Sequence, residues 1–156
     1  VNKTAHRRIP VILCKLDSIN HLPDIESVRK TFERVSLFAY PDGMFIFDVN
    51  TVYKHREVLA GNAFVYDLDG LFCVWQNEYE PEDDSVDIYL DFFEENGQGS
   101  YGRFQESFTE RAYPCEVIEC ILAQTGFEIL GEFDGYSDIS PGEKTERIVY
   151  VTKKCR

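Results

Sequence analysis

The first third of the chain places two apolar runs on either side of one amphipathic segment. Residues 11–16 are mostly apolar and rich in branched side chains, which is typical of a strand buried on both faces. After Pro23, apolar residues recur with helical spacing over residues 25–35 and predict a helix. Residues 40–43 have turn chemistry and lead into a second buried strand at 44–49. This order predicts a right-handed βαβ unit with two parallel neighbouring strands.

The middle of the chain has the features of an antiparallel sheet. Asp69 and Gly70 separate two β-rich runs and predict a hairpin, and apolar residues then alternate with polar ones from residue 86. A turn at residues 96–100 leads into a last run in which Phe104 and Phe108 share a face. We predict a four-stranded antiparallel meander, with strands at residues 63–68, 71–80, 86–93 and 101–112.

Helical signals flank this meander on both sides. A short helix is predicted over residues 51–59, with Thr51 as its N-cap and Gly61 beyond its end. A second begins near Pro114 and ends at Gly126. Strands at residues 127–133 and 147–151 close the chain. We expect one domain, whose α/β part comprises residues 1–62 and 113–156 and whose β insertion comprises residues 63–112.

Composition and charge narrow the classes of partner. The 28 acidic and 16 basic side chains give a formal net charge of −12, which disfavours nucleic acid and anionic membranes as partners. No apolar run reaches membrane-spanning length and no signal peptide is evident, so a cytoplasmic protein is expected. The five cysteines include no C-x-x-C pair, which argues against a disulfide framework and against a zinc site. No metal is expected.

Polar residues follow both predicted parallel strands. Residues 17–21 (Asp-Ser-Ile-Asn-His) come after the first strand, and Asp48 and Asn50 end the second. Ligands favour this edge, because the carboxyl ends of parallel strands border one crevice. Structural roles stay open: residues 17–21 could simply turn the chain and cap the helix, although their place at the strand end favours a ligand, and Asn50 serves equally well as an ordinary helix start. His21 is either a base that works near neutral pH or a solvated side chain.

Four motifs in a fixed order carry a family resemblance. They are C-K-L-D-S-I-N-H at 14–21, M-F-I-F-D-V-N at 44–50, W-Q-N-E-Y at 75–79 and E-R-A-Y at 110–113, followed by a helix and strand at 116–130. In this order they resemble the class I S-adenosylmethionine-dependent methyltransferases from their fourth strand onward, and in particular small bacterial members of uncharacterised substrate. The resemblance covers nearly the whole chain.

The resemblance implies a fold, a cofactor and a set of site residues. The fold is an α/β, truncated Rossmann-like sheet with strand order 4-5-7-6 and an inserted antiparallel β meander. The cofactor is S-adenosylmethionine, and the second substrate is a small-molecule methyl acceptor. No obligatory catalytic residue is implied, because methyl transfer depends chiefly on proximity and orientation. The implied cofactor-binding residues are Asp17, Ser18 and Asn20, and the implied acceptor-binding residues are Asp48, Asn50, Tyr53, Trp75 and Arg111.

The predicted meander offers a possible lid over the acceptor. Trp75, Arg111 and two tyrosines, Tyr66 and Tyr79, either cover the acceptor or form ordinary cross-strand pairs. The acidic residues 80–84 are interpreted as solvated surface.

Two features of that family have no counterpart here. The family's Gly-rich loop and its second-strand acidic residue are not found, and Gly97, Gly99 and Gly102 lie in an acidic hairpin loop. The chain starts with Val1, and its only methionine is Met44, so we expect a processed or truncated piece. The strand at 11–16 would then lie at a sheet edge and pair with a missing N-terminal half or with itself. The alternatives are a non-catalytic binding or assembly module that uses the β insertion, and an unrelated α+β domain.

Overall fold

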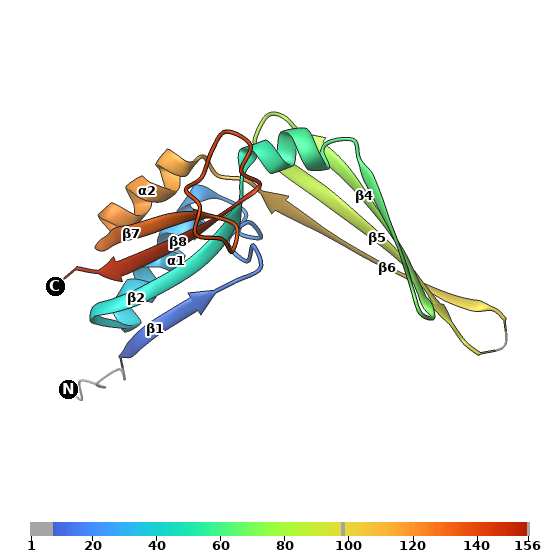
Figure 1. Ribbon diagram of the computed structural model, residues 1–156, viewed down its shortest axis with the longest axis horizontal. Coiled ribbons are helices and arrows are strands. Elements are labelled where there is room, and N and C mark those ends of the chain that lie inside the picture. The colour runs from blue at the N-terminus through green and yellow to red at the C-terminus, as the bar shows by residue number, and fades with distance from the viewer. Residues whose placement is uncertain (1–7, 98, 156) are drawn as a thin grey trace.

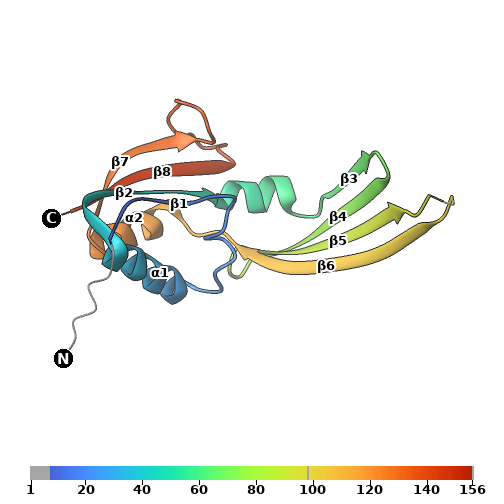
Figure 2. The same cartoon turned by 90° about the horizontal axis from the view of Figure 1, so that it is seen from below.

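Two four-stranded sheets organise the computed structural model, which describes residues 8–97 and 99–155. The first sheet carries two helices on one face, and the second extends away from it as a long arm (Figures 1 and 2). The first sheet has the order β1-β2-β8-β7, formed by β1 (Ile9–Cys14), β2 (Ala39–Asn50), β8 (Arg147–Lys154) and β7 (Phe127–Asp134). The second has the order β3-β4-β5-β6, formed by β3 (Ala63–Leu68), β4 (Leu71–Glu80), β5 (Ser85–Glu95) and β6 (Tyr101–Arg111).

The predicted βαβ unit is confirmed. Strands β1 and β2 are parallel and in register from the Val11–Met44 pair to the Cys14–Phe47 pair. Helix α1 (Ile25–Phe38) connects them and starts at Asp24, whose carboxylate accepts the Ser27 amide hydrogen. Strand β8 lies antiparallel between β2 and β7, so the start of β8 is next to the carboxyl end of β2.

The core lies between the first sheet and its two helices. Helices α1 and α2 (Cys115–Gln124) cover the same face of the sheet (Figure 2). Phe45 and Phe47 of β2 alternate onto that face, where Phe32 of α1 meets both rings at centroid distances of 5.4 and 5.1 Å. Tyr150 stacks on Phe47 from β8. Burial of these rings, together with apolar residues of α2, ties both helices to the sheet.

Strand β1 confirms one expectation and corrects another. It lies at the sheet edge, as predicted for a truncated sheet, but it is not buried on both faces, because Leu13 is 60% exposed. Val11 and Leu16 are exposed as well. The apolar sequence therefore describes a strand that is suited to burial, while in this chain only β2 lies beside it.

The predicted turn at residues 40–43 lies inside β2 as a bulge. Between the Ile9–Ala39 and Val11–Met44 pairs, β2 has four residues opposite a single residue of β1. Asp42 adopts a positive φ of 60°. A Cβ at Gly43 would lie 2.9 Å from the Tyr40 carbonyl oxygen within the bulge and 3.1 Å from the Pro10 carbonyl oxygen of β1, so only glycine fits between them without a shift of the backbone.

The remaining elements largely follow the predictions. The meander is confirmed, with Leu68 and Leu71 paired across the Asp69–Gly70 turn, although Gln98 of the predicted 96–100 turn lies outside the described residues. The short helix after β2 ends in a π-helical segment, η1 (Lys54–Leu59), and Thr51 caps it by accepting the Lys54 amide hydrogen. All five cysteines are free. Among the described residues no helix combines the length and apolar character needed to cross a membrane.

Candidate functional site

A partly buried ion-pair cluster joins the carboxyl ends of β1 and β2 to the start of β8. Arg147 donates to Oδ2 of Asp17 at 2.7 Å and also to Oδ2 of Asp48. The Asp17 amide donates to the same Asp48 oxygen at 3.2 Å. Asp48 is only 1% exposed, so Arg147 supplies the positive charge that a buried carboxylate needs. Leu16 and Asp17 hold positive φ values of 59° and 49°, a strained pair at the turn after β1.

Asn20 connects the two sheets. Its side chain accepts the Asn50 amide hydrogen at 2.9 Å and donates to the carbonyl oxygens of Asn50 at 3.0 Å and Arg111 at 2.9 Å. Its own carbonyl accepts the Arg111 amide hydrogen at 2.7 Å. The fully buried Asn20 thus fixes the end of β6 against the end of β2.

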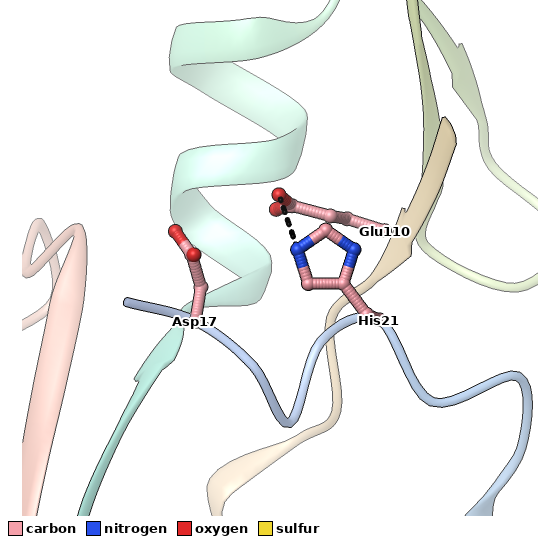
Figure 3. Close-up of side chains that lie close together, drawn as sticks. All are labelled: Asp17, His21 and Glu110. Carbon is pink, nitrogen blue, oxygen red and sulfur yellow. Dashed lines mark ion pairs between the residues drawn. The ribbon is translucent and has the colours of Figure 1, made fainter. Parts of the chain in front are cut away.

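A carboxylate from the second sheet enters the same region. Glu110, near the end of β6, points toward Asp17 and His21 (Figure 3). Its Oε1 lies 3.7 Å from Nε2 of His21, and its Oε2 accepts from Nδ2 of the Asn50 side chain at 3.0 Å. Burial raises the pKa of Glu110, and the nearby Asp17 carboxylate adds to that rise. Glu110 therefore holds a proton more readily than an exposed glutamate does.

Two basic side chains of the helix after β2 complete the cluster. Lys54 donates to Oδ1 of Asn50 at 3.0 Å, and burial lowers its pKa. His55 is fully buried, with Nδ1 2.8 Å from the Asp84 carbonyl oxygen and Nε2 3.8 Å from Oε2 of Glu110. Burial lowers the pKa of His55, so its ring favours the neutral form. The cluster thus contains groups able to hold a proton beside the strand ends.

The side-chain oxygen and nitrogen atoms of Asp17, His21 and Glu110 lie within 4.8 Å of one another, which is close enough for one metal ion to contact all three. Hydrogen-bond donors already occupy this space. Arg147 and the side-chain amide of Asn50 both donate to Asp17, and the same Asn50 amide also donates to Glu110. A cation would have to displace Arg147 or bind beside its positive charge. We therefore treat these residues as a polar and proton-holding cluster.

The other expected site residues lie around this cluster or away from it. Ser18 is exposed and donates to the Lys15 carbonyl oxygen. Tyr53 lines a separate hollow of about 350 Å³ together with Thr51, Cys115 and Glu143. The structure thus brings together Asp17, Asn20, Asp48 and Asn50, and leaves Ser18 and Tyr53 outside their hydrogen-bond network.

The aromatic residues of the expected lid bond mainly within the second sheet and its neighbouring helix. The Trp75 indole donates to Asn77 at 2.5 Å, and its ring packs edge-on against Phe64. Tyr66 contacts Trp75 at a centroid distance of 6.5 Å. Tyr79 donates to Asp84 at 2.6 Å. These contacts are those of side chains that hold the meander together.

Residues 80–83 are exposed, as predicted for a solvated loop, and Asp84 is partly buried. Asp83 forms an ion pair with Arg111, and Asp84 accepts from Arg56 at 2.7 Å and from Tyr79. Opposite charges and the phenol hydrogen bond hold the pKa of Asp84 below its usual range against the opposing effect of burial. This loop fixes the end of the second sheet and positions the Asp84 carbonyl for His55.

Comparisons with known proteins show what this chain is similar to. No protein-family model matches the chain. A structure of an S-adenosylmethionine-dependent methyltransferase from Clostridium acetobutylicum ATCC 824 is 40% identical, with a TM-score of 0.89 over 99% of this chain and 62% of that one. YqeM of Bacillus subtilis (strain 168), which is described by similarity as a methyltransferase, is 30% identical over 94% of this chain and 58% of its own length. Over nearly its whole length the chain is thus similar to part of an S-adenosylmethionine-dependent methyltransferase.

The chain spans about three fifths of each of those relatives. A more distant similarity concerns the fold alone: CcbJ methyltransferase from Streptomyces caelestis is 11% identical and matches all of this chain and 61% of its own, with a TM-score of 0.81. The arm formed by the second sheet is thus part of the shared fold, because the match extends over the whole of this chain.

Proposed function

We propose that this protein transfers a methyl group from S-adenosylmethionine to a small-molecule acceptor. The observation that carries the proposal is the convergence of Asp17, Asn20 and Asp48 at the carboxyl ends of two parallel strands, in a chain 40% identical to an S-adenosylmethionine-dependent methyltransferase. In this proposal β1, β2, β8 and β7 correspond to strands four, five, seven and six of the complete methyltransferase sheet.

The residues of the cluster fit the charges of the cofactor. S-adenosylmethionine carries a cationic sulfonium and an amino-acid group with one charge of each sign. The Asp17 and Arg147 side chains are 19% and 20% exposed, so a carboxylate and a guanidinium are both accessible beside the strand ends. When bound, the cofactor supplies the electrophilic methyl group. In this proposal Asp17 faces the cationic groups, Ser18 and Asn20 shape the turn around them, and Asp48 and Asn50 hold these residues in place.

Binding of the cofactor tests this proposal. Calorimetric titration of the full-length protein with S-adenosylmethionine should give saturable binding, and Asp17→Asn should weaken it about tenfold or more, because about 1.4 kcal/mol of charge interaction is lost. Asp67→Asn in β3 is the matched control and should leave affinity unchanged. Formation of S-adenosylhomocysteine with a panel of small amines and alcohols would identify the acceptor. Absence of binding at millimolar cofactor would contradict the proposal.

The exposed edge of β1 is explained if β1 is an inner strand of a larger methyltransferase sheet. An apolar edge strand with unpaired backbone groups recruits another strand, and natural proteins usually cover such an edge. We infer that β1 pairs with a further strand of the methyltransferase sheet, and that copies of this chain alone associate through it. The exposure of Val11, Leu13 and Leu16 supports this inference.

Analytical ultracentrifugation tests whether copies of the chain associate through the edge of β1. We expect self-association that Leu13→Lys abolishes with little change in melting temperature, because Leu13 is exposed and a charge blocks edge pairing. Leu130→Lys in β7, at the opposite edge of the sheet, is the control and should still associate. A wild-type chain that stays monomeric, with freely exchanging β1 amides, would rule the inference out.

A further inference from the structure

The position of His55 fixes which of its ring nitrogens carries hydrogen. Its Nδ1 lies 2.8 Å from the Asp84 carbonyl oxygen, and a carbonyl oxygen only accepts hydrogen bonds. Nδ1 must therefore carry a hydrogen. In the neutral ring Nε2 is then a bare acceptor, and it is buried without a hydrogen-bond partner among the described residues.

The bare nitrogen faces a second acceptor. Oε2 of Glu110 lies 3.8 Å from Nε2 of His55, and both side chains are shielded from water. Two lone pairs facing each other in a buried site repel, and an unsatisfied buried acceptor costs about 1–3 kcal/mol. The separation of 3.8 Å exceeds hydrogen-bond length, so one proton between the two atoms, together with a closer approach of the two side chains, would turn this repulsion into a hydrogen bond. Burial raises the pKa of Glu110 and lowers that of His55, which favours the carboxyl group as the carrier.

His21 connects this pair to solvent. Its Nε2 lies 3.7 Å from the other carboxyl oxygen of Glu110, and its side chain is 44% exposed. The Phe108 ring packs beside it at a centroid distance of 5.2 Å. The three side chains thus form a line from solvent to the buried ring. Other polar and charged groups that face this line are Asp17, Asn50, Lys54 and Asp84.

We propose that Glu110 and His55 share one buried proton, and that His21, beside this pair, relays the proton of the methyl acceptor to solvent. The relay role rests on the proposed methyl transfer. As the acceptor atom bonds to the methyl carbon, the carbon–sulfur bond breaks, sulfur keeps the electron pair, and the acceptor proton goes to Nδ1 of His21. The shared proton moves from Glu110 to His55. The resulting carboxylate lies between two imidazolium rings, and His21 later releases its proton to solvent.

Nuclear magnetic resonance of the protein with labelled histidine and glutamate tests the shared proton directly. We expect His55 to be the neutral Nδ1–H tautomer with a hydrogen-bonded Nε2, and the Glu110 carboxyl to titrate above its ordinary range. Glu110→Gln should keep the His55 tautomer, because the amide donates a hydrogen as the protonated acid does. A hydrogen on Nε2 alone, or an ordinary Glu110 titration, would overturn the inference, and this measurement requires neither cofactor nor acceptor.

Kinetics with S-adenosylmethionine and the acceptor found in the amine and alcohol panel test the relay. Glu110→Gln should keep the melting temperature and cofactor affinity but lower kcat about a hundredfold and change its pH profile, because the amide holds its hydrogens permanently. Glu106→Gln, exposed on the same strand, is the matched control. An unchanged kcat and pH profile in Glu110→Gln would overturn the relay and leave the proposed methyl transfer standing. Failure of the wild-type protein to bind cofactor would overturn the relay together with the proposed function. The shared proton is tested separately, by the nuclear magnetic resonance measurement.

Discussion

Replacement of Arg147 by methionine should lower the free energy of unfolding by about 3–5 kcal/mol, the usual cost of removing one partner of a buried ion pair. Arg147 compensates Asp17 and Asp48, and Asp48 is 1% exposed. Methionine retains much of the apolar stem, so the loss reports the charge rather than packing. Urea unfolding at neutral pH measures the effect.

Two further variants separate the buried pair from general charge effects. Arg103→Met removes a more exposed arginine that pairs with Asp91 in the second sheet, and it should cost less than about 1 kcal/mol. Asp48→Asn combined with Arg147→Met should recover part of the loss, because no buried charge then remains at position 48. Equal costs for Arg147→Met and Arg103→Met would show that burial of Asp48 does not determine the strength of the interaction.

The βαβ unit and the meander could be predicted because their signals are local. Helical spacing between two apolar runs, and an Asp-Gly turn between β-rich runs, specify neighbouring elements without knowledge of the rest of the fold. The apolar pattern of β1 wrongly indicated burial on both faces, whereas the expected truncation of the sheet correctly placed this strand at an edge. An apolar pattern indicates that a strand tolerates burial. Whether the strand is actually buried depends on which other strands lie beside it.

The candidate site was predicted in part for a similar reason. Asp17, Asn20, Asp48 and Asn50 follow two consecutive strands, so the parallel pairing of those strands is enough to bring them together. Arg147 is 99 residues from Asp48 in sequence and reaches it only because β8 runs antiparallel to β2, which pairs Asn50 with Arg147. No local pattern encodes this arrangement.

The sequence pattern did not identify Glu110 as a site residue, although Glu110 begins the E-R-A-Y motif. The E-R-A-Y segment directed attention to Arg111, and in the structure the Arg111 side chain pairs with Asp83 while its neighbour Glu110 enters the cluster. Successive residues of a strand point to opposite faces, so the choice between them requires knowledge of which face meets the first sheet. The Asn20 contacts to the Arg111 backbone set that orientation.

Replacement of Asn20 by alanine should destabilise the chain by about 3 kcal/mol or more. The change leaves the Asn50 amide and the carbonyls of Asn50 and Arg111 without their side-chain partner, and each unsatisfied buried group costs about 1–3 kcal/mol. Asn62→Ala is the matched control, because Asn62 is exposed and donates one bond to the Val58 carbonyl, so its loss should cost less than about 1 kcal/mol.

Hydrogen exchange distinguishes the role of Asn20 as a connector from a general loss of stability. We expect the Asn50 amide to lose protection in Asn20→Ala, since this amide donates to the Asn20 side chain, while β4 and β5 amides within the second sheet keep their relative protection. Uniform loss of protection across both sheets would instead mean that Asn20 contributes only to overall stability. Selective loss would mean that this one side chain aligns the end of β6, and with it Glu110, against the strand ends of the first sheet.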